Sequence, residues 1–149
     1  MEQDNDLDAF TAEDVFDELR SVIDPEHPGV TLADLNVITK ERCVVCPMPR
    51  PPGSWSKKPR RKVTVVLKPT VPHCHLMLLI ALCVRTRLFD RLPLDTEWKV
   101  DIALVDGSHL DQKAIEKQVN DKERVRGASE NKAMMDVVRT LTDPHKGEH

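Results

Sequence analysis

Apolar residues recur with helical spacing near the start of the chain. They lie between residues 10 and 23, where Thr11 is placed as the N-cap and Asp14 stands at the capping-box position. The segment 24–29, which contains two prolines and a glycine, ends this helix. A second capping residue, Thr31, begins a short helical turn. This part of the chain predicts one amphipathic helix followed by a turn-rich connection.

Two segments rich in β-branched residues follow, at 37–45 and 62–67, and they predict two strands. The stretch 47–61 between them contains five prolines together with a glycine and two serines. We interpret it as a long Pro-rich, basic loop at the tip of an antiparallel hairpin.

The apolar run Leu76–Val84 is the central feature of the pattern. Pro72 prevents the preceding strand from continuing, so the pattern predicts a helix over about 73–92 that Pro93 closes. The first half of this helix is apolar nearly all round, which predicts burial against a sheet.

A third strand over 97–105 and a turn at 106–108 come next. They are followed by a short helix over about 110–119 and by a last helix that Ser129 caps and that runs to 141. The order is therefore helix, strand, strand, helix, strand, helix, helix. It predicts an α+β fold, a small two-layer domain with a mixed three-stranded sheet.

Length and composition fit one soluble domain. The chain has 149 residues, of which 40% are hydrophobic, 32% charged and only 3% aromatic, so aliphatic side chains must build the core. We expect a single domain over 10–141, an acidic disordered segment at 1–9 and a frayed tail at 142–149. The longest apolar run is far shorter than the roughly 20 residues of a membrane span, so we expect no membrane association.

Four cysteines in a chain of this length do not make a disulfide framework. The first nine residues are polar and acidic, unlike a secretory signal peptide. We therefore expect reduced thiols in the cytosol or nucleus.

Cys74 stands between His73 and His75 at the predicted start of the central helix. Helix N-termini carry unpaired N–H groups and partial positive charge, which favour a thiolate, and a protonated histidine adds to this effect. A packed, inert cysteine is the alternative. The residues leave open whether the thiol is a nucleophile, a redox group or a ligand of a metal or cluster.

The spacing Cys43-x-x-Cys46 is that of one half of a zinc site. The other half would have to come from His73, Cys74 or His75. Residues three apart on a strand face opposite sides, so a chelate requires a turn here, and coincidence is the favoured interpretation. The alternative function that follows is a zinc- or thiol-dependent protein using Cys43, Cys46, Cys74 and His75. Cys83 belongs to the core.

A basic run, Lys57–Lys62, lies in the loop with Arg50 and Trp55 nearby. It could contact nucleic acid or act as a nuclear-localisation signal. A solvated loop is favoured, because the loop has no ordered platform of aromatic side chains on which bases could stack. Nucleic acid is therefore not an expected partner.

Several short motifs occur in a fixed order along the chain. They are Asp24-Pro25-Glu26-His27-Pro28, Leu35-Asn36-Val37, Pro69-Thr70-Val71-Pro72-His73-Cys74, Lys99-Val100-Asp101, Gly107-Ser108-His109 and Asn120-Asp121-Lys122-Glu123-Arg124-Val125. Over about 15–141 this ordered set resembles the eukaryotic late-acting cytosolic iron–sulfur assembly factor, component two of the targeting complex. That family belongs with the bacterial SufT and PaaD-type domains.

The resemblance implies a protein that is not an enzyme and that helps deliver iron–sulfur clusters to cytosolic and nuclear apoproteins. The implied partners are a WD-repeat β-propeller protein, a HEAT-repeat adaptor and client proteins that include DNA polymerases, helicases and repair enzymes. The role would therefore support DNA metabolism and chromosome partition indirectly. The cofactor implied is a transient iron–sulfur cluster rather than zinc. The oligomeric state stays open, including a homodimer with exchanged helices.

The resemblance also assigns residues. The family's reactive, cluster-contacting cysteine matches Cys74, with His73 and the turn of Asp24, Pro25 and Glu26 beside it in the shared pattern. The chain departs from the family in its longer 47–61 loop. His75 stands where a small helix-capping residue is expected, and Gly127 follows Arg126 where relatives favour alanine.

Overall fold

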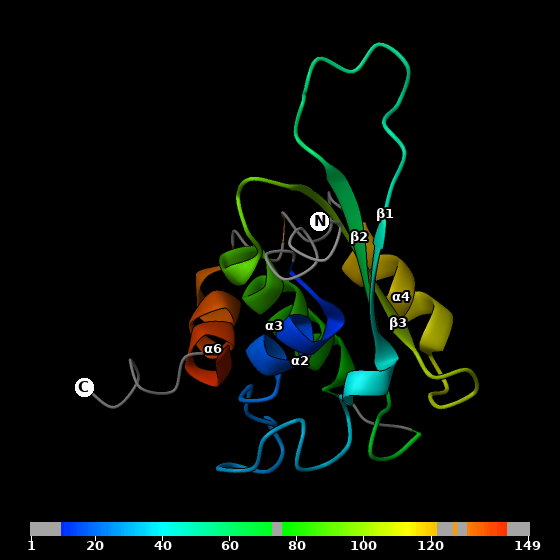
Figure 1. The fold of residues 1–149 in the computed structure, drawn as a ribbon. Coiled ribbons are helices and arrows are strands. Elements are labelled where there is room, and N and C mark those ends of the chain that lie inside the picture. The colour runs from blue at the N-terminus through cyan, green and yellow to red at the C-terminus, as the bar shows by residue number, and fades with distance from the viewer. Residues whose placement is uncertain (1–9, 73–75, 122–126, 128–130, 143–149) are drawn as a thin grey trace.

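The computed structural model describes residues 10–72, 76–121, 127 and 131–142. Its elements are α2 (Ala12–Leu19), the 3-10 helix η1 (Lys40–Arg42), β1 (Cys43–Pro47), β2 (Arg60–Leu67), α3 (Met77–Arg91), β3 (Glu97–Leu104), α4 (Gln112–Asn120) and α6 (Lys132–Thr142). The predicted α+β fold and its order of helices and strands are confirmed (Figure 1). No helix within the described residues is long and apolar enough to cross a membrane.

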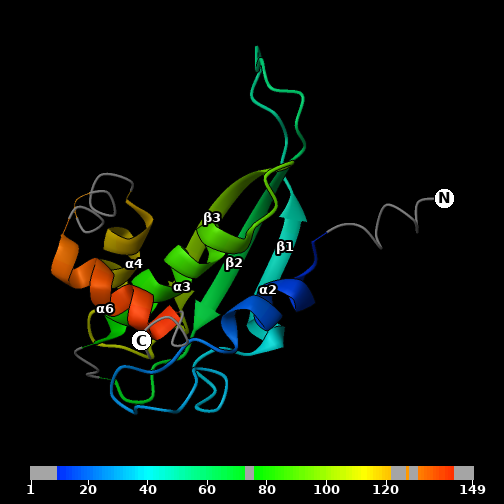
Figure 2. The ribbon, with the colours of Figure 1, turned by 90° about the vertical axis from the view of Figure 1, so that its left-hand side faces the viewer.

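The sheet has the order β1-β2-β3 and is mixed, as predicted. β1 pairs antiparallel with β2, with Cys43 opposite Val65, while β2 and β3 run parallel with Val63 opposite Val100. α3 is the crossover between the two parallel strands. It packs on one face of the sheet together with α2, and α6 packs on α3 (Figures 1 and 2).

Alternate residues of the strands form the sheet's side of the core. The buried ones in β2 and β3 are Val63, Val65, Leu67, Val100, Ile102 and Leu104. The first half of α3 is buried on most of its sides, which confirms the prediction from its apolar pattern. Full burial of one such aliphatic side chain stabilises the fold by roughly 1.5–3 kcal/mol, so the packing of α3 on the sheet contributes strongly to stability.

The capping box of the first helix is confirmed, but the helix is shorter than predicted. The Asp14 amide donates to Thr11 Oγ1 and the Thr11 amide donates to Asp14 Oδ2. α2 ends at Leu19, and Val22 and Ile23 take part in other contacts. The Leu32 amide donates to the Val22 carbonyl at 2.8 Å, and the Ile23 amide donates to the carbonyl of Leu141 in α6 at 3.0 Å.

The first strand begins later than predicted. β1 starts at Cys43 because the chain before it is not extended as a strand. Asn36 has a positive φ of 58°, and the Val37 amide donates to the Leu32 carbonyl at 3.0 Å. The Arg42 side chain then donates to the carbonyls of Val37 and Val66. These contacts tie the segment to the end of β2 as a turn and a 3-10 helix.

α3 begins at Met77, so the predicted start at about residue 73 was wrong. Leu76 has non-helical dihedral angles, φ −98° and ψ 11°, and no side chain caps the helix there. The predicted end is confirmed, since α3 stops at Arg91 before Pro93. The predicted cap of the last helix, Ser129, lies outside the described residues. The Asn131 side chain accepts a bond from the Met134 amide at 3.1 Å, so Asn131 caps the start of α6.

The free edge of β3 is covered by side chains of α4. Asn120 accepts from the Ile102 amide at 3.0 Å and donates to the Ile102 carbonyl at 2.9 Å, while Glu116 accepts from the Leu104 amide at 2.8 Å. An uncovered edge strand exposes unpaired backbone groups to association with other chains. The predicted short helix, which begins at Gln112, therefore protects the edge of the sheet.

Candidate functional site

One end of the sheet gathers the segments that the sequence motifs single out. β2 and β3 run parallel, so they end on the same side, where α3 begins and where the connection 20–39 also lies (Figure 1). Backbone bonds join these connections: the Val105 amide donates to the Leu67 carbonyl at 2.8 Å, and the Lys68 amide to the Val37 carbonyl at 2.9 Å. The residues that directly follow β2 and β3, Lys68 and Val105, are thereby held in place.

The three central residues of the predicted site, His73, Cys74 and His75, lie outside the described residues. The structure does place the residues on either side of them. The Pro72 carbonyl accepts from the Leu110 amide at 2.9 Å, and the Leu76 carbonyl accepts from the Ile80 amide at 2.9 Å as the first bond of α3. The residue before the site segment is therefore bonded to the connection between β3 and α4, and the residue after it begins the hydrogen bonding of the core helix.

The predicted supporting turn is built around a buried carboxylate. Asp24 is 2% exposed. Its Oδ1 accepts from the Glu26 amide at 3.0 Å, its Oδ2 lies 3.0 Å from His27 Nδ1, and its backbone carbonyl accepts from the His27 amide at 3.2 Å. Pro25 lies within this turn. The carboxylate fixes the orientation of the imidazole, because Nδ1 faces the acid and Nε2 then points away from it.

His109 is a second fixed imidazole at this end of the sheet. It is buried, and its Nδ1 accepts from the Asp111 amide at 2.9 Å. In the neutral ring the proton is therefore on Nε2. The next residue, Leu110, donates to the Pro72 carbonyl. The motif of Gly107, Ser108 and His109 thus lies beside the chain that leads to Cys74. The spacing of the two motifs in the sequence does not show that they are neighbours.

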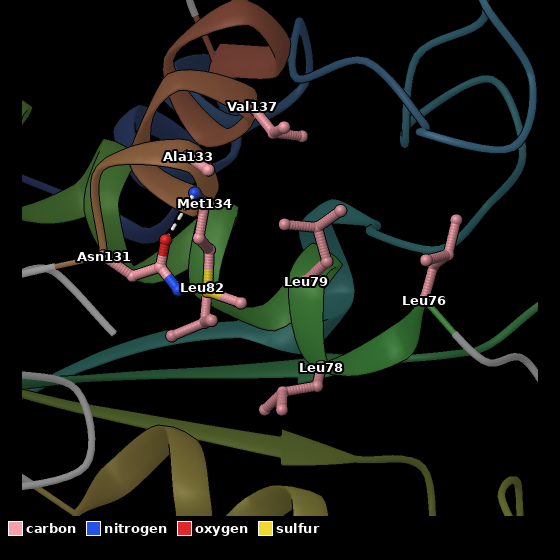
Figure 3. A pocket seen from close by; sticks show the side chains of 8 residues that line it. All are labelled: Leu76, Leu78, Leu79, Leu82, Asn131, Ala133, Met134 and Val137. Carbon is pink, nitrogen blue, oxygen red and sulfur yellow. Dashed lines mark hydrogen bonds between the residues drawn. The ribbon is translucent and has the colours of Figure 1, made fainter. Parts of the chain in front are cut away.

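An apolar pocket of about 480 Å³ opens between the start of α3 and α6 (Figure 3). Its lining residues are Leu76, Leu78, Leu79, Leu82, Asn131, Ala133, Met134 and Val137. Among the described lining residues, Asn131, the cap of α6, has the one polar side chain. The sequence interpretation missed this pocket. The signal was present in adjacent leucines on more than one side of α3, which a single facing sheet does not cover.

Comparison with known proteins relates most of the chain to one group. No family model matches it. It is 37% identical over 138 residues to mouse "Cytosolic iron-sulfur assembly component 2B", an alignment that covers 92% of this chain and 76% of the mouse protein. It is 39% identical over 125 residues to Arabidopsis thaliana "Protein AE7", covering 84% and 71%. It is 40% identical over 126 residues to the Drosophila melanogaster "MIP18 family protein galla-1", covering 85% and 53%.

The chain belongs to the cytosolic iron–sulfur assembly component two (MIP18) family. The resemblance found in the ordered sequence motifs is thereby confirmed. Its assignments of Cys74, His73 and the turn of Asp24, Pro25 and Glu26 remain predictions for this family member.

The other three cysteines of this family member are divided between core and sheet surface. Cys43 and Cys83 are buried, and burial raises the pKa of Cys43 to about 11 and that of Cys83 to about 12. Cys46 is part-exposed. The placement of Cys83 in the core is confirmed.

The two thiols of the C-x-x-C lie in one regular strand. Cys43 and Cys46 pair in continuous register with Val65 and Lys62 of β2, so they point to opposite faces of the sheet. The turn that a shared metal ion would require is absent from β1. Among the described residues, no group of three or more His, Cys, Asp or Glu side chains is placed to hold a metal ion. A site that adds Cys74 and His75 involves residues outside that part of the chain.

Proposed function

We propose that this protein is a non-catalytic component of the cytosolic iron–sulfur assembly machinery. The observation that carries the proposal is similarity over most of the chain to proteins named cytosolic iron-sulfur assembly component 2B, from mouse and from Dictyostelium discoideum. The ordered motifs of the chain point the same way. In this role the protein helps deliver iron–sulfur clusters to apoproteins in the cytoplasm and nucleus. Its effect on DNA metabolism and chromosome partition is indirect, through its clients.

Cys74 is the residue that contacts the cluster in this proposal, with His73 beside it. A thiolate is the protein ligand that iron–sulfur clusters use most, and the cluster is cargo here rather than a resident cofactor. Support comes from the fixed backbone on both sides of the segment, at Pro72 and Leu76. The buried Asp24 carboxylate and the His109 imidazole show that polar groups at this end of the sheet are held in defined orientations.

The protein acts within an assembly. From the resemblance, its partners are a WD-repeat β-propeller protein and a HEAT-repeat adaptor, and together they select client apoproteins. A component of this kind holds partners and cargo together and catalyses no reaction of its own. Replacement of Cys74 should therefore abolish transfer of the cluster and leave binding of the partners intact.

Capture of the two purified partners by the tagged full-length protein tests the proposal. We expect the wild-type protein, Cys74→Ala and the control Cys46→Ala to retain both partners, while Cys74→Ala alone loses transfer of a cluster to an apoprotein client. Failure of the wild-type protein to capture either partner would contradict membership of the complex. Unchanged transfer by Cys74→Ala would contradict the role of the thiol.

A further inference from the structure

The segment between β1 and β2 projects beyond the sheet as a long hairpin tip, residues 48–59 (Figures 1 and 2). β2 runs from Arg60 at the tip to Leu67 at the opposite end, which is the end that leads to Pro72. A strand of this length spans roughly 23 Å at about 3.3 Å per residue. The tip is therefore well separated from Leu67 at the far end of β2, and the function proposed above does not use it.

Charge is strongly segregated onto this hairpin. Residues 48–62 contain six of the 22 Lys and Arg residues and no Asp or Glu. The rest of the chain keeps 16 basic side chains against 25 acidic ones. A local excess of this kind on a projecting segment attracts a partner of opposite charge, and the acidic remainder of the molecule repels the same partner elsewhere.

The tip is held by its own hydrogen bonds. Arg50 Nη2 donates to the Lys58 carbonyl at 2.7 Å, and Arg60 Nη1 donates to the Pro49 carbonyl at 3.1 Å. Lys58 donates its amide to Ser56 Oγ at 3.2 Å and its Nζ to the Leu94 carbonyl at 3.0 Å. These bonds across the loop reduce the conformational freedom that a binding partner would otherwise have to remove.

Trp55 stands at this tip with 98% of its surface exposed. A tryptophan side chain carries on the order of 200 Å² of mostly apolar surface, and leaving it in water is unfavourable. Trp and Arg are also the residues most enriched at the energetic centres of protein interfaces. A solvent-exposed Trp55 among the exposed Arg50, Lys57 and Lys58 thus has the composition of such a centre.

The cations at the base of the hairpin already contact side chains of β3. Arg60 Nε lies 3.5 Å from Glu97, and Lys62 Nζ lies 3.7 Å from Asp101. Arg61 stacks 5.3 Å from the centroid of the Trp98 ring. A nucleic-acid strand that followed the hairpin would meet the two carboxylates, whereas Arg50, Lys57 and Lys58 at the tip have no acidic partner among the described residues. The three cations of the tip are enough to pair with a short acidic segment.

We propose that the tip, with Arg50, Trp55, Lys57 and Lys58, binds an acidic segment of a partner protein that also presents an apolar side chain. The carboxylates of that segment pair with the three cations. Its apolar side chain covers the indole of Trp55. Binding of this type weakens with salt, because the charges lie in solvent.

Fluorescence anisotropy with the full-length protein tests the proposal. The probe is a labelled peptide of alternating Glu and Ser with one central Leu, measured at low ionic strength and at about 0.5 M salt, where the Debye length is only a few ångströms. We expect Trp55→Ala and the double variant Lys57→Gln/Lys58→Gln each to weaken binding about tenfold or more. The control Lys113→Gln/Lys117→Gln removes two charges from α4 and should bind as the wild type does.

Three outcomes overturn the proposal. One is equal binding by the hairpin variants and the α4 control. Another is tighter binding of a single-stranded oligothymidylate of the same length, since the tip would then be a nucleic-acid site. The third is a large gain in peptide affinity when Glu2, Asp4, Asp6 and Asp8 are changed to their amides. That gain would show that the chain's own acidic N-terminal segment occupies the tip.

Discussion

Arg85 is buried in α3 without adequate hydrogen bonding. The residue is 9% exposed, and in the part of the chain that the structure describes neither Nε nor Nη1 has a hydrogen-bond partner. Burial lowers the pKa of its guanidinium group, and the main compensation is stacking on Phe89, with the guanidinium carbon 4.8 Å from the ring centroid. Unpaired buried polar atoms are unfavourable, so this side chain contributes little or nothing to stability.

Replacement of Arg85 by methionine should therefore leave the free energy of unfolding unchanged or raise it by up to about 2 kcal/mol. Methionine has a similar length and no polar atoms to leave unpaired. Arg20, whose guanidinium lies 5.8 Å from the Phe16 ring on the surface of α2, provides the matched control. Arg20→Met should stay within about 0.5 kcal/mol of wild type. Urea unfolding measures both, and a loss of more than about 1 kcal/mol in Arg85→Met would contradict the account.

Two of the thiols should resist modification until the protein unfolds. Burial raises the pKa of Cys43 to about 11 and that of Cys83 to about 12, so both remain protonated at neutral pH. We expect iodoacetamide at pH about 8 to alkylate part-exposed Cys46 in the native protein, and Cys43 and Cys83 only in urea. Mass spectrometry of the alkylated peptides distinguishes these outcomes. Equal labelling of Cys46 and Cys83 in the native state would be the contrary result.

The same raised pKa values predict the direction of the stability change in alkali. A folded-state pKa above the unfolded value of 9.0 means that the fold favours the protonated thiol. The free energy of unfolding is then independent of these thiols below pH 9 and falls as the pH rises toward 11. Urea titrations at pH about 8 and about 10.5 should show this fall, and it should be smaller in Cys83→Ala. The chain has no Tyr to titrate in that range.

Among the elements, α4 has the clearest separable task, because its side chains complete the hydrogen bonding of β3. Asn120→Ala leaves the amide and the carbonyl of Ile102 without their side-chain partners. We expect it to lower the free energy of unfolding by about 1–3 kcal/mol and to speed hydrogen exchange at the Ile102 amide. Gln118→Ala, on the same helix, is the control. If the two variants are equally stable, α4 does not protect the edge.

The order of elements could be predicted from sequence because its signals are local. The apolar period of the first helix, the prolines around the hairpin and Pro93 after α3 each act within a few residues. The starts of β1 and α3 could not be predicted in this way. The first depends on Arg42 bonding to Val66, which lies 24 residues away, and the second on Leu76 adopting non-helical dihedral angles.

The local features of the candidate site could likewise be predicted from sequence, whereas its contacts between distant residues could not. Sequence reasoning identified the turn at Asp24 and noted that a strand would separate Cys43 from Cys46, and the regular pairing of β1 shows that separation. It could not place Leu110 against Pro72 or form the pocket between α3 and α6, because both depend on how distant elements pack. Family resemblance, rather than local pattern, pointed to Cys74 as the cluster-contacting residue.

At the scale of the whole molecule, the two proposed tasks lie at opposite ends of one sheet. The hairpin tip is outside the core, and the Pro72 segment follows the far end of β2. Replacement of residues 49–59 by Asn-Gly, a sequence suited to a two-residue hairpin, should preserve the fold and the capture of the assembly partners. Circular dichroism and capture of the partners measure this. Loss of the folded state would show that the tip supports the core.

The proposed function depends on contact between Cys74 and an iron–sulfur cluster. Anaerobic reconstitution with ferrous iron and sulfide, followed by gel filtration and iron and sulfide analysis, tests it most directly. We predict that the wild-type protein and Cys46→Ala retain iron and sulfide together with the visible absorption of a cluster, and that Cys74→Ala retains neither. Equal iron and sulfide in Cys74→Ala and the wild-type protein would contradict the claim.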